Sequence, residues 1–181
     1  MKALILNCSP VRDGATAKIC EIVANALRDR YTVTMSCIDD FSISFCKGCR
    51  TCHETAKCVQ RDDAEKLMRL FAENDVLLMV APSYWGDVPG QFKAFIDRCT
   101  PWSNTHEPHA ELPKGKKGYC ITLRTGGGEK EAVHLCDTID HFFSHLNIEA
   151  AGRLPLTSIE NRKDAEGRQT EIERFCNFVK A

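Results

Sequence analysis

The 181-residue sequence contains no long uninterrupted hydrophobic run. A membrane-spanning helix needs about 20 consecutive apolar residues, and no stretch of the chain approaches that length. The N-terminal residues MKALILNCSP hold only a short apolar stretch, and no small-residue cleavage site follows it, so they lack the pattern of a signal peptide. We therefore expect no membrane association and a cytoplasmic location.

The chain also lacks an excess of charge of either sign. Its 24 Lys and Arg residues and 25 Asp and Glu residues give a formal net charge of -1. A protein that binds many phosphate groups needs a basic face, so this balance argues against a nucleic-acid partner. Internal repeats, low-complexity tracts and linkers are absent as well, and the length suits one domain spanning residues 1–181.

Cysteine, by contrast, is abundant, with 11 residues in the chain. Most of them stand singly inside apolar segments, where a cysteine is usually a small buried residue of a protein in a reducing compartment. Only the segment 46–58, CKGCRTCHETAKC, gathers four cysteines in a short stretch. That segment therefore needs an explanation other than packing.

Short apolar segments alternate along the chain with longer segments of helical periodicity. The segment DVLLMVAP (75–82) is continuously apolar, as expected of a strand that is buried on both faces. Residues 100–117 carry three prolines and no periodic pattern, so we expect a long exposed loop there. Strands that alternate with helices predict a doubly wound α/β fold, in which helices cover both faces of a parallel sheet. The expected strands are 2–9, 31–38, 75–82, 118–125 and 147–156, and the expected helices are 14–28, 64–74, 91–99, 129–146 and 159–180.

Three loops that contain glycine or proline follow expected strands, at residues 9–16, 82–90 and 125–128. Ligands of parallel α/β folds bind beyond the carboxyl ends of the strands, so we predict one common site for these loops. None of the three has the pattern G-x-x-x-x-G-K-[ST] or G-x-G-x-x-G that marks familiar nucleotide-binding loops.

The first loop, SPVRDGAT (9–16), leads directly into an expected helix. Backbone N–H groups at a helix N-terminus attract anions. Ser9 and Thr16 add hydroxyl donors, Arg12 adds a positive charge, and Gly14 allows the backbone to approach a ligand closely. The loop fits a phosphate site or, equally well, a plain strand–helix turn capped by Ser or Thr.

The other two loops offer surfaces of a different kind. Tyr84 and Trp85 in PSYWGDVPG (82–90) suggest stacking against a flat ligand, although the two rings could instead pack under the 100–117 loop. The segment RTGGG (124–128) offers bare backbone to the edge of a ligand. Its three glycines are hard to explain by folding alone, because they increase the entropy lost on folding.

Three motifs together resemble the NADPH-dependent FMN reductase family, and within it the branch of iron–sulfur flavoprotein-like reductases. They are LNCSPVRDGAT, then CKGCRTC with a further cysteine downstream, and APSYWGDVPGQFKAFIDR. The resemblance covers nearly the whole chain. It implies a flavodoxin-like fold with a five-stranded parallel sheet in the order 2-1-3-4-5, bound FMN, and a homodimer or dimer of dimers with the flavin near the subunit interface.

The resemblance also assigns residues to the three parts of FMN. The sequence departs from the family pattern at two positions, because Arg12 falls one place later than usual and Ala15 stands where Asn is common. The phosphate would be held by Ser9, Arg12, Gly14, Ala15 and Thr16, the isoalloxazine ring would be lined by Pro82, Ser83, Tyr84, Trp85 and Gly86, and its pyrimidine edge would lie near Thr125, Gly126, Gly127 and Gly128.

The four clustered cysteines have the spacing C-x2-C-x2-C-x5-C and would be inserted after the second strand. Short spacings of this kind resemble the cysteine run of bacterial ferredoxins. The family resemblance implies that Cys46, Cys49, Cys52 and Cys58 would bind one [4Fe–4S] cluster. Free thiols without a cluster are an equal alternative. A structural zinc site is less consistent with the spacing, and a disulfide pair is least consistent with a reducing compartment.

The function that the resemblance implies is electron transfer from NAD(P)H through FMN to a quinone, a flavin or a similar small acceptor. The cofactor carries this chemistry, so we assign no catalytic residue, although Arg124 could stabilise negative charge on a reduced flavin. One alternative is an electron carrier in which FMN and a [4Fe–4S] cluster exchange electrons with ferredoxin. A further alternative is a binding protein that senses redox state through zinc or thiols.

Overall fold

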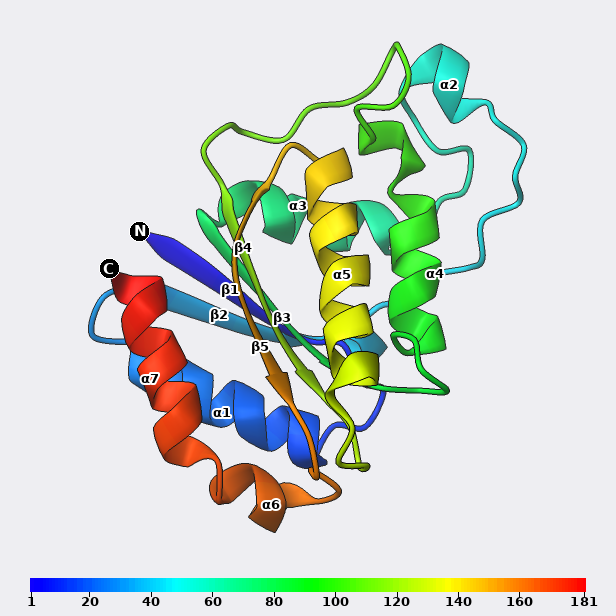
Figure 1. The fold of residues 1–181 in the computed structure, drawn as a ribbon. Helices are drawn as coiled ribbons and strands as arrows, with labels where there is room; N and C mark the ends of the chain where they lie inside the picture. The colour runs from blue at the N-terminus through cyan, green and yellow to red at the C-terminus, as the bar shows by residue number, and fades with distance from the viewer.

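The computed structural model describes residues 1–181, and its five strands form one parallel sheet. The strand order is β2-β1-β3-β4-β5, as predicted for a flavodoxin-like fold (Figure 1). Every neighbouring pair of strands runs parallel. The strands are β1 (Lys2–Asn7), β2 (Thr32–Cys37), β3 (Val76–Pro82), β4 (Lys117–Leu123) and β5 (Glu149–Leu156).

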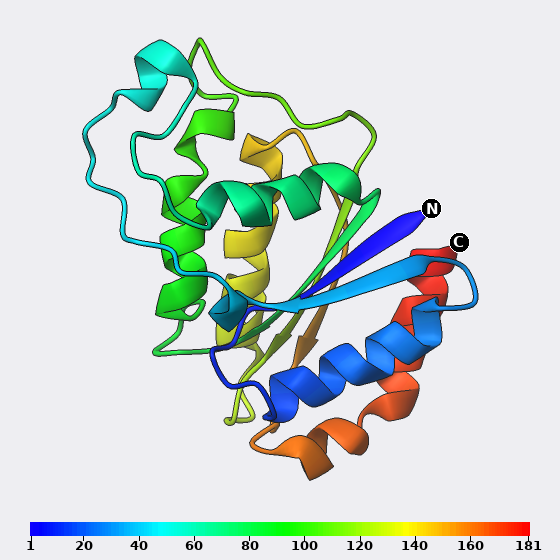
Figure 2. The same ribbon diagram turned by 180° about the vertical axis from the view of Figure 1, so that it is seen from behind.

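Helices cover both faces of the sheet, so the molecule has three layers (Figures 1 and 2). One layer contains α1, α6 and α7, and the opposite layer contains α3, α4 and α5. The short helix α2 lies apart from both layers, in the cysteine segment. The helices are α1 (Ala15–Leu27), α2 (Cys52–Thr55), α3 (Ala64–Glu73), α4 (Gly90–Arg98), α5 (Glu129–His145), α6 (Arg162–Glu166) and α7 (Gln169–Lys180), with 3-10 turns η1 (Ile38–Asp40) and η2 (Thr100–Trp102).

The central position of β3 in the sheet explains why its sequence is apolar without interruption. Leu78 and Val80 point into the core between the sheet and α1, whereas Leu77 and Met79 point into the core on the other face. All four side chains are completely buried. A strand with helices on both faces has no position that needs a polar side chain, so the prediction for residues 75–82 is confirmed.

Two predictions about the course of the chain are wrong. The expected single helix 159–180 is two helices, because Asn161 caps the short helix α6 and the chain turns at Gly167 before α7 begins. The 100–117 segment is not wholly exposed, because Pro101 and Lys116 are buried. The Lys116 ammonium group donates hydrogen bonds to two backbone carbonyl groups at the end of α3, which ties this segment to the domain core.

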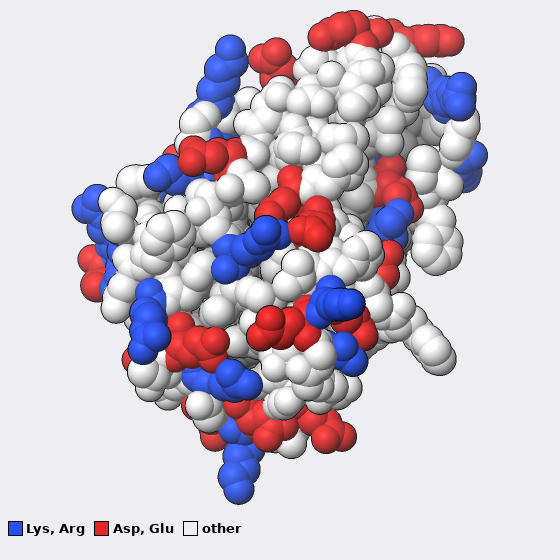
Figure 3. Space-filling model, viewed as in Figure 1, with Lys and Arg blue, Asp and Glu red and all other residues white.

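None of the helices combines the length and the apolar character that crossing a membrane requires. On the face that Figure 3 shows, basic and acidic side chains lie interspersed, and no broad area carries one sign of charge. This distribution agrees with the small formal net charge of the whole chain, -1.

Candidate functional site

The three loops singled out in the sequence meet in one cavity at the carboxyl edge of the sheet. The cavity has a volume of about 200 Å³. Parallel strands bring the segments that follow them to the same edge, so residues far apart in the chain become neighbours here. The lining residues are Ser9, Val11, Gly14, Ala15, Thr16, Pro82, Ser83, Tyr84, Leu123, Arg124, Thr125, Ile159 and Glu160.

The first loop is shaped by hydrogen bonds among its own residues. The Ser9 N–H group donates to the Asn7 side chain over 2.9 Å, and the Ser9 hydroxyl oxygen accepts from the Val11 N–H group over 3.1 Å. Gly14 then occupies the N-cap position of α1, where no side chain caps the helix. The first N–H groups of α1 therefore remain open to an anion at the cavity.

The second loop turns sharply at its tip. Tyr84 and Asp87 exchange backbone hydrogen bonds of 2.8 and 3.2 Å, while Trp85 and Gly86 between them have φ angles of 56° and 81°. Only Tyr84 of these residues lines the cavity. The Trp85 side chain is fully exposed, at 105% of the reference area, so it does not pack under the 100–117 segment.

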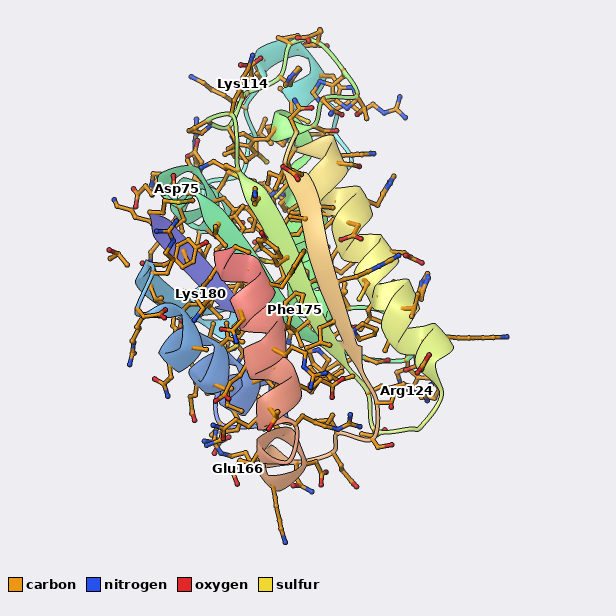
Figure 4. All side chains as sticks on the ribbon, turned by 60° about the vertical axis from the view of Figure 1, so that its left-hand side comes forward. Asp75, Lys114, Arg124, Glu166, Phe175 and Lys180 are labelled. Atoms are coloured by element: carbon orange, nitrogen blue, oxygen red, sulfur yellow. The ribbon has the colours of Figure 1, made fainter.

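The third loop wraps around Arg124, at the junction of β4 and α5 (Figure 4). The Arg124 guanidinium donates to the Gly128 carbonyl over 3.0 Å and pairs with Glu131 over 3.2 Å. A Cβ atom at Gly126 would lie 2.5 Å from the guanidinium. Gly126 and Gly128 thus make room for the Arg124 side chain, and none of Gly126, Gly127 and Gly128 lines the cavity.

Glu131 is a residue of this site that the sequence analysis missed. Its carboxylate also accepts a hydrogen bond from the Ser83 hydroxyl group, so it joins the second loop to the third. The Ser83 oxygen in turn accepts from the Gly86 N–H group over 3.2 Å. The only sequence signal was an acidic residue in the first turn of the helix that follows the glycines.

Arg12 is not part of the cavity, contrary to the expectation from the sequence. Its guanidinium forms ion pairs of 2.9 Å with Asp39 and 2.6 Å with Asp40, in the turn after β2. Partial burial alone would raise the pKa of Asp40, but hydrogen bonds from the Cys37 N–H group and from Arg12 hold that pKa below its usual value. Two neighbouring carboxylates therefore bind the Arg12 guanidinium outside the cavity that Ser9 and Gly14 line.

The four clustered cysteines line a second, small cavity of about 30 Å³ beside the end of α4. Cys46 and Cys49 are exposed, Cys52 and Cys58 are half-buried, and all four are free thiols, so no disulfide forms. Hydrogen bonds from Thr51 lower the pKa of Cys49, whereas burial and then the neighbouring thiols raise the pKa of Cys52.

The donor set of this second cavity fits a thiolate-bound metal group in kind. Four cysteine thiolates are the ligands that iron–sulfur clusters take, and tetrahedral zinc accepts the same set. No three His, Cys, Asp or Glu side chains of the chain have the arrangement of a closed metal site. Binding would therefore require the four thiols to move closer to one another.

The rim of the cysteine cavity carries basic side chains that have no acidic partner. All of them are exposed, and none takes part in an ion pair. They contrast with Arg12, Lys93 and Arg153, which all pair with carboxylates elsewhere on the surface. Lys47 and Arg50 line this cavity, and Lys57 and Arg61 stand next to the lining residues Cys58 and Gln60 in the chain.

Comparison with known proteins shows the family to which the chain belongs. Residues 1–153 match the family model described as NADPH-dependent FMN reductase. An iron–sulfur flavoprotein of Archaeoglobus fulgidus is 35% identical over 134 residues, which cover 74% of this chain and 59% of that relative. This chain therefore spans about three-fifths of the length of that relative.

Solved structures of distant relatives share the fold. The NAD(P)H:quinone oxidoreductase of Methanothermobacter marburgensis has a TM-score of 0.73 at 12% identity, with 100% of this chain and 98% of the other covered. An FMN-dependent NADH-azoreductase of Bacillus anthracis, solved in complex with FMN, has a TM-score of 0.72 at 12% identity, with 99% of each chain covered. The sequence match over most of the chain, joined to this fold, shows that the chain belongs to the NADPH-dependent FMN reductase family.

Proposed function

We propose that this chain is an FMN-dependent oxidoreductase that takes electrons from NAD(P)H and passes them to a quinone, a flavin or a similar small acceptor. The observation that carries the proposal is the cavity where three strand-end loops meet at an uncapped helix N-terminus. The first loop, with Ser9 and Thr16, would bind the phosphate of FMN, and the second loop, with Tyr84, would border its flat ring. The family and the quinone-reducing neighbour support the same reaction class.

Particular residues of the cavity would hold FMN. The Ser9 and Thr16 hydroxyl groups and the N–H groups at the start of α1 would bind the phosphate, and Gly14 would leave space for it. Pro82, Ser83, Tyr84 and Thr125 would border the ring. When bound, FMN supplies hydride acceptance and electron release, so the protein needs no nucleophile or general base.

The surrounding residues would set the shape and the charge of the ring site. Glu131 neutralises Arg124 and fixes Ser83, so the charge next to the ring is a balanced pair and not a free cation. Trp85 stands beyond the cavity, where it could cover the ring of a second subunit in a homodimer. The nicotinamide would bind transiently over the flavin, because the chain has no dinucleotide-binding fingerprint.

Flavin analysis of the purified protein tests this proposal. We expect a yellow protein that releases noncovalent FMN on heat or acid denaturation, at about one FMN for each chain after loading. Identification of the released flavin by chromatography separates FMN from FAD and riboflavin. A colourless protein that takes up no FMN from a large excess would contradict the proposal.

A second candidate function is that of an electron carrier in which FMN and a [4Fe–4S] cluster exchange electrons with ferredoxin. It is favoured by the cavity of four free thiols and by the unpaired cations Lys47 and Arg50, which line the same cavity. Basic patches speed encounters with acidic partner surfaces, and the effect weakens as salt is added. The name of the relative from Archaeoglobus fulgidus, iron–sulfur flavoprotein, is consistent with this candidate.

Anaerobic reconstitution with iron and sulfide, followed by iron analysis, tests the second candidate. Four irons per chain that are lost in Cys49→Ala while FMN remains would support it. Iron at background level would leave a flavin reductase whose cysteine segment carries thiols only. Electron exchange with reduced ferredoxin should then be slower in a Lys47→Glu/Arg50→Glu variant than in the wild type, and more so at low salt.

A further inference from the structure

Arg98, the last residue of α4, is a buried cation in a structure whose other ion pairs lie near the surface. Its side chain is only 1% exposed. Both ends of the guanidinium bind the Asp62 carboxylate, with Nη1–Oδ2 at 2.6 Å and Nη2–Oδ1 at 3.0 Å. Removing one partner of a buried pair leaves an uncompensated charge, so the position tolerates little change. The burial of Arg98 therefore points to a specific role for its positive charge.

The contacts of Arg98 join the two ends of the cysteine segment. Besides Asp62, the guanidinium donates to the Ser44 carbonyl over 2.9 Å. Asp62 also accepts from the Ser44 N–H group over 3.0 Å, so one ion pair holds residues on either side of segment 46–58. A parallel contact runs from the Ser42 N–H group to Asp63 over 2.9 Å. The segment is therefore closed into a loop at its base and fastened to α4.

The same guanidinium faces the thiols. Arg98 lines the small cavity together with the four cysteines, and it lies beside the Cys58 thiol. Its Nε atom is buried and has no hydrogen-bond partner in the protein. In Figures 1 and 2 the cysteine segment extends outward beside α4 and returns to it, with α2 near the C-terminal end of that helix.

Cysteine binds metals as the thiolate, so a loaded site of four cysteines gathers negative charge. A fixed guanidinium at its wall would offset that charge and keep the ligands in place. We propose that Arg98 is the positioning residue of the cysteine site, which closes the 46–58 loop and sets a permanent positive charge beside the thiolates of a bound metal group. This inference rests on the metal site proposed for the cysteines and is independent of the flavin cavity.

Arginine suits both parts of this role better than lysine does. The planar guanidinium can bind the Asp62 carboxylate with two parallel hydrogen bonds and still reach the Ser44 carbonyl, whereas an ammonium group provides a point charge. Methionine has a similar reach but neither charge nor donors. Comparison of Arg98→Lys with Arg98→Met therefore isolates the contribution of the positive charge, and comparison of the wild type with Arg98→Lys isolates that of the paired hydrogen bonds.

Metal binding to the unloaded protein, measured without oxygen, is the test. Co²⁺ is the probe, because thiolate ligation gives it a charge-transfer absorption that free Co²⁺ lacks. Lys93→Met is the matched control, since Lys93 lies on the same helix and pairs with Asp97 over 2.6 Å on the surface. We expect Arg98→Met to weaken Co²⁺ binding by at least about tenfold, Arg98→Lys to recover part of the loss, and the control to match the wild type.

Hydrogen exchange gives a second measurement that needs no metal. In Arg98→Lys, the backbone N–H groups of Ser42 and Ser44 should exchange faster than in the wild type, while those of β3 stay protected. This conservative variant keeps the proposal testable even where Arg98→Met fails to fold. It also shows whether residues 42–44 separate from Asp62 and Asp63 when the positive charge remains and only the paired hydrogen bonds of the guanidinium are lost.

Three results would overturn the proposal. The first is equal Co²⁺ affinity of wild type, Arg98→Lys and Arg98→Met. The second is an equal loss in the Lys and Met variants, which would show that the positive charge of Arg98 contributes nothing to metal binding. The third is a wild type that gives no thiolate–cobalt absorption, which removes the metal site itself. FMN content measured on the same samples keeps each of these failures distinct from a failure of the flavin function.

Discussion

Gly14 is the residue on which the phosphate end of the flavin cavity depends most directly. Its φ angle of -80° is open to any residue, so backbone conformation does not require glycine here. Space limits this position instead, because a Cβ atom would lie 3.0 Å from Val11 Cγ1, so that Val11 would have to shift by a few tenths of an ångström. Gly90, at the start of α4, has nothing within 4 Å of its own Cβ position and provides a comparison.

Replacing Gly14 with valine should expel FMN. The added side chain would overpack the loop at a cost of about 1–3 kcal/mol and would occupy the approach of the phosphate, so affinity should fall about tenfold or more. Gly90→Ala should keep its flavin. The measurement is FMN content and dissociation constant for both variants, with circular dichroism to show that they are folded. Full flavin occupancy in Gly14→Val would refute the placement of the phosphate.

Glu131 shows what the sequence could not reveal at the scale of single residues. Ser9, Gly14 and Thr16 were predicted from a strand–loop–helix pattern, because the hydrogen bonds that shape such a turn are local in the chain. The partners of Arg12, Ser83 and Arg124 were not predicted, because they come from elements brought near by the fold. An arginine that adjoins a predicted site in the sequence can thus be neutralised by a carboxylate from another part of the chain.

At the scale of elements, the attachment of the cysteine segment to α4 depends on one ion pair. Asp62 lies just before α3 and Arg98 ends α4, so the pair also links two helices of one layer. Partial burial alone would raise the pKa of Asp62, but hydrogen bonds from Arg98, Ser44 and Ala64 hold that pKa below its usual value. The carboxylate form is therefore the one that the folded chain prefers.

Asp62→Ala should destabilise the protein by about 3–5 kcal/mol, because it leaves Arg98 buried without a partner. The double variant Asp62→Ala/Arg98→Met should be closer to the wild type than the single variant, since it removes both charges. Urea unfolding of the four proteins measures the coupling. Additive losses would show that the two residues do not act as a pair.

The same pair predicts how stability changes in acid. Because the pKa of Asp62 is lower in the folded than in the unfolded chain, its contribution is fully present above the unfolded value of about 3.9. The contribution is lost as the pH falls below that value and through the folded pKa. Unfolding free energy measured against pH should show this loss in the wild type and a shallower slope in Asp62→Ala. Identical slopes would contradict the assignment.

The order of the elements was predictable, because the apolar run of β3 and the helical periodicity around it are local signals. The break between α6 and α7 was not, since apolar positions such as Ile172 continue a helical pattern across Gly167. The buried end of the 100–117 segment was missed for a different reason. Lys116 looks like a surface residue in the sequence and becomes a buried donor only when α3 supplies carbonyl groups.

At the scale of the whole molecule, the exposed aromatic side chain of Trp85 at the edge of the flavin cavity indicates a missing partner surface. It is fully exposed, and Tyr84, which lines the cavity, also exposes 42% of its area. Large exposed aromatic groups close to a site are typical of interfaces. A homodimer that covers the open edge of the flavin would shield these rings from water.

We therefore expect the FMN-loaded protein to be a dimer that Trp85→Glu dissociates. The substitution would place a charge without a partner in an apolar contact, while leaving the cavity lining intact. Light scattering coupled to size-exclusion chromatography measures the mass of both proteins over a range of concentrations. A wild type that stays monomeric at high concentration with FMN bound would argue against this interface.

The reduction of bound FMN by a nicotinamide tests the proposed function most directly. The FMN-loaded protein is titrated with NADH or NADPH in the absence of oxygen, and the visible absorption of the flavin is followed. The account predicts that one equivalent of at least one nucleotide bleaches the flavin, and that a quinone added afterwards restores the colour. A flavin that neither nucleotide reduces, but that dithionite reduces at once, would contradict an NAD(P)H-dependent oxidoreductase.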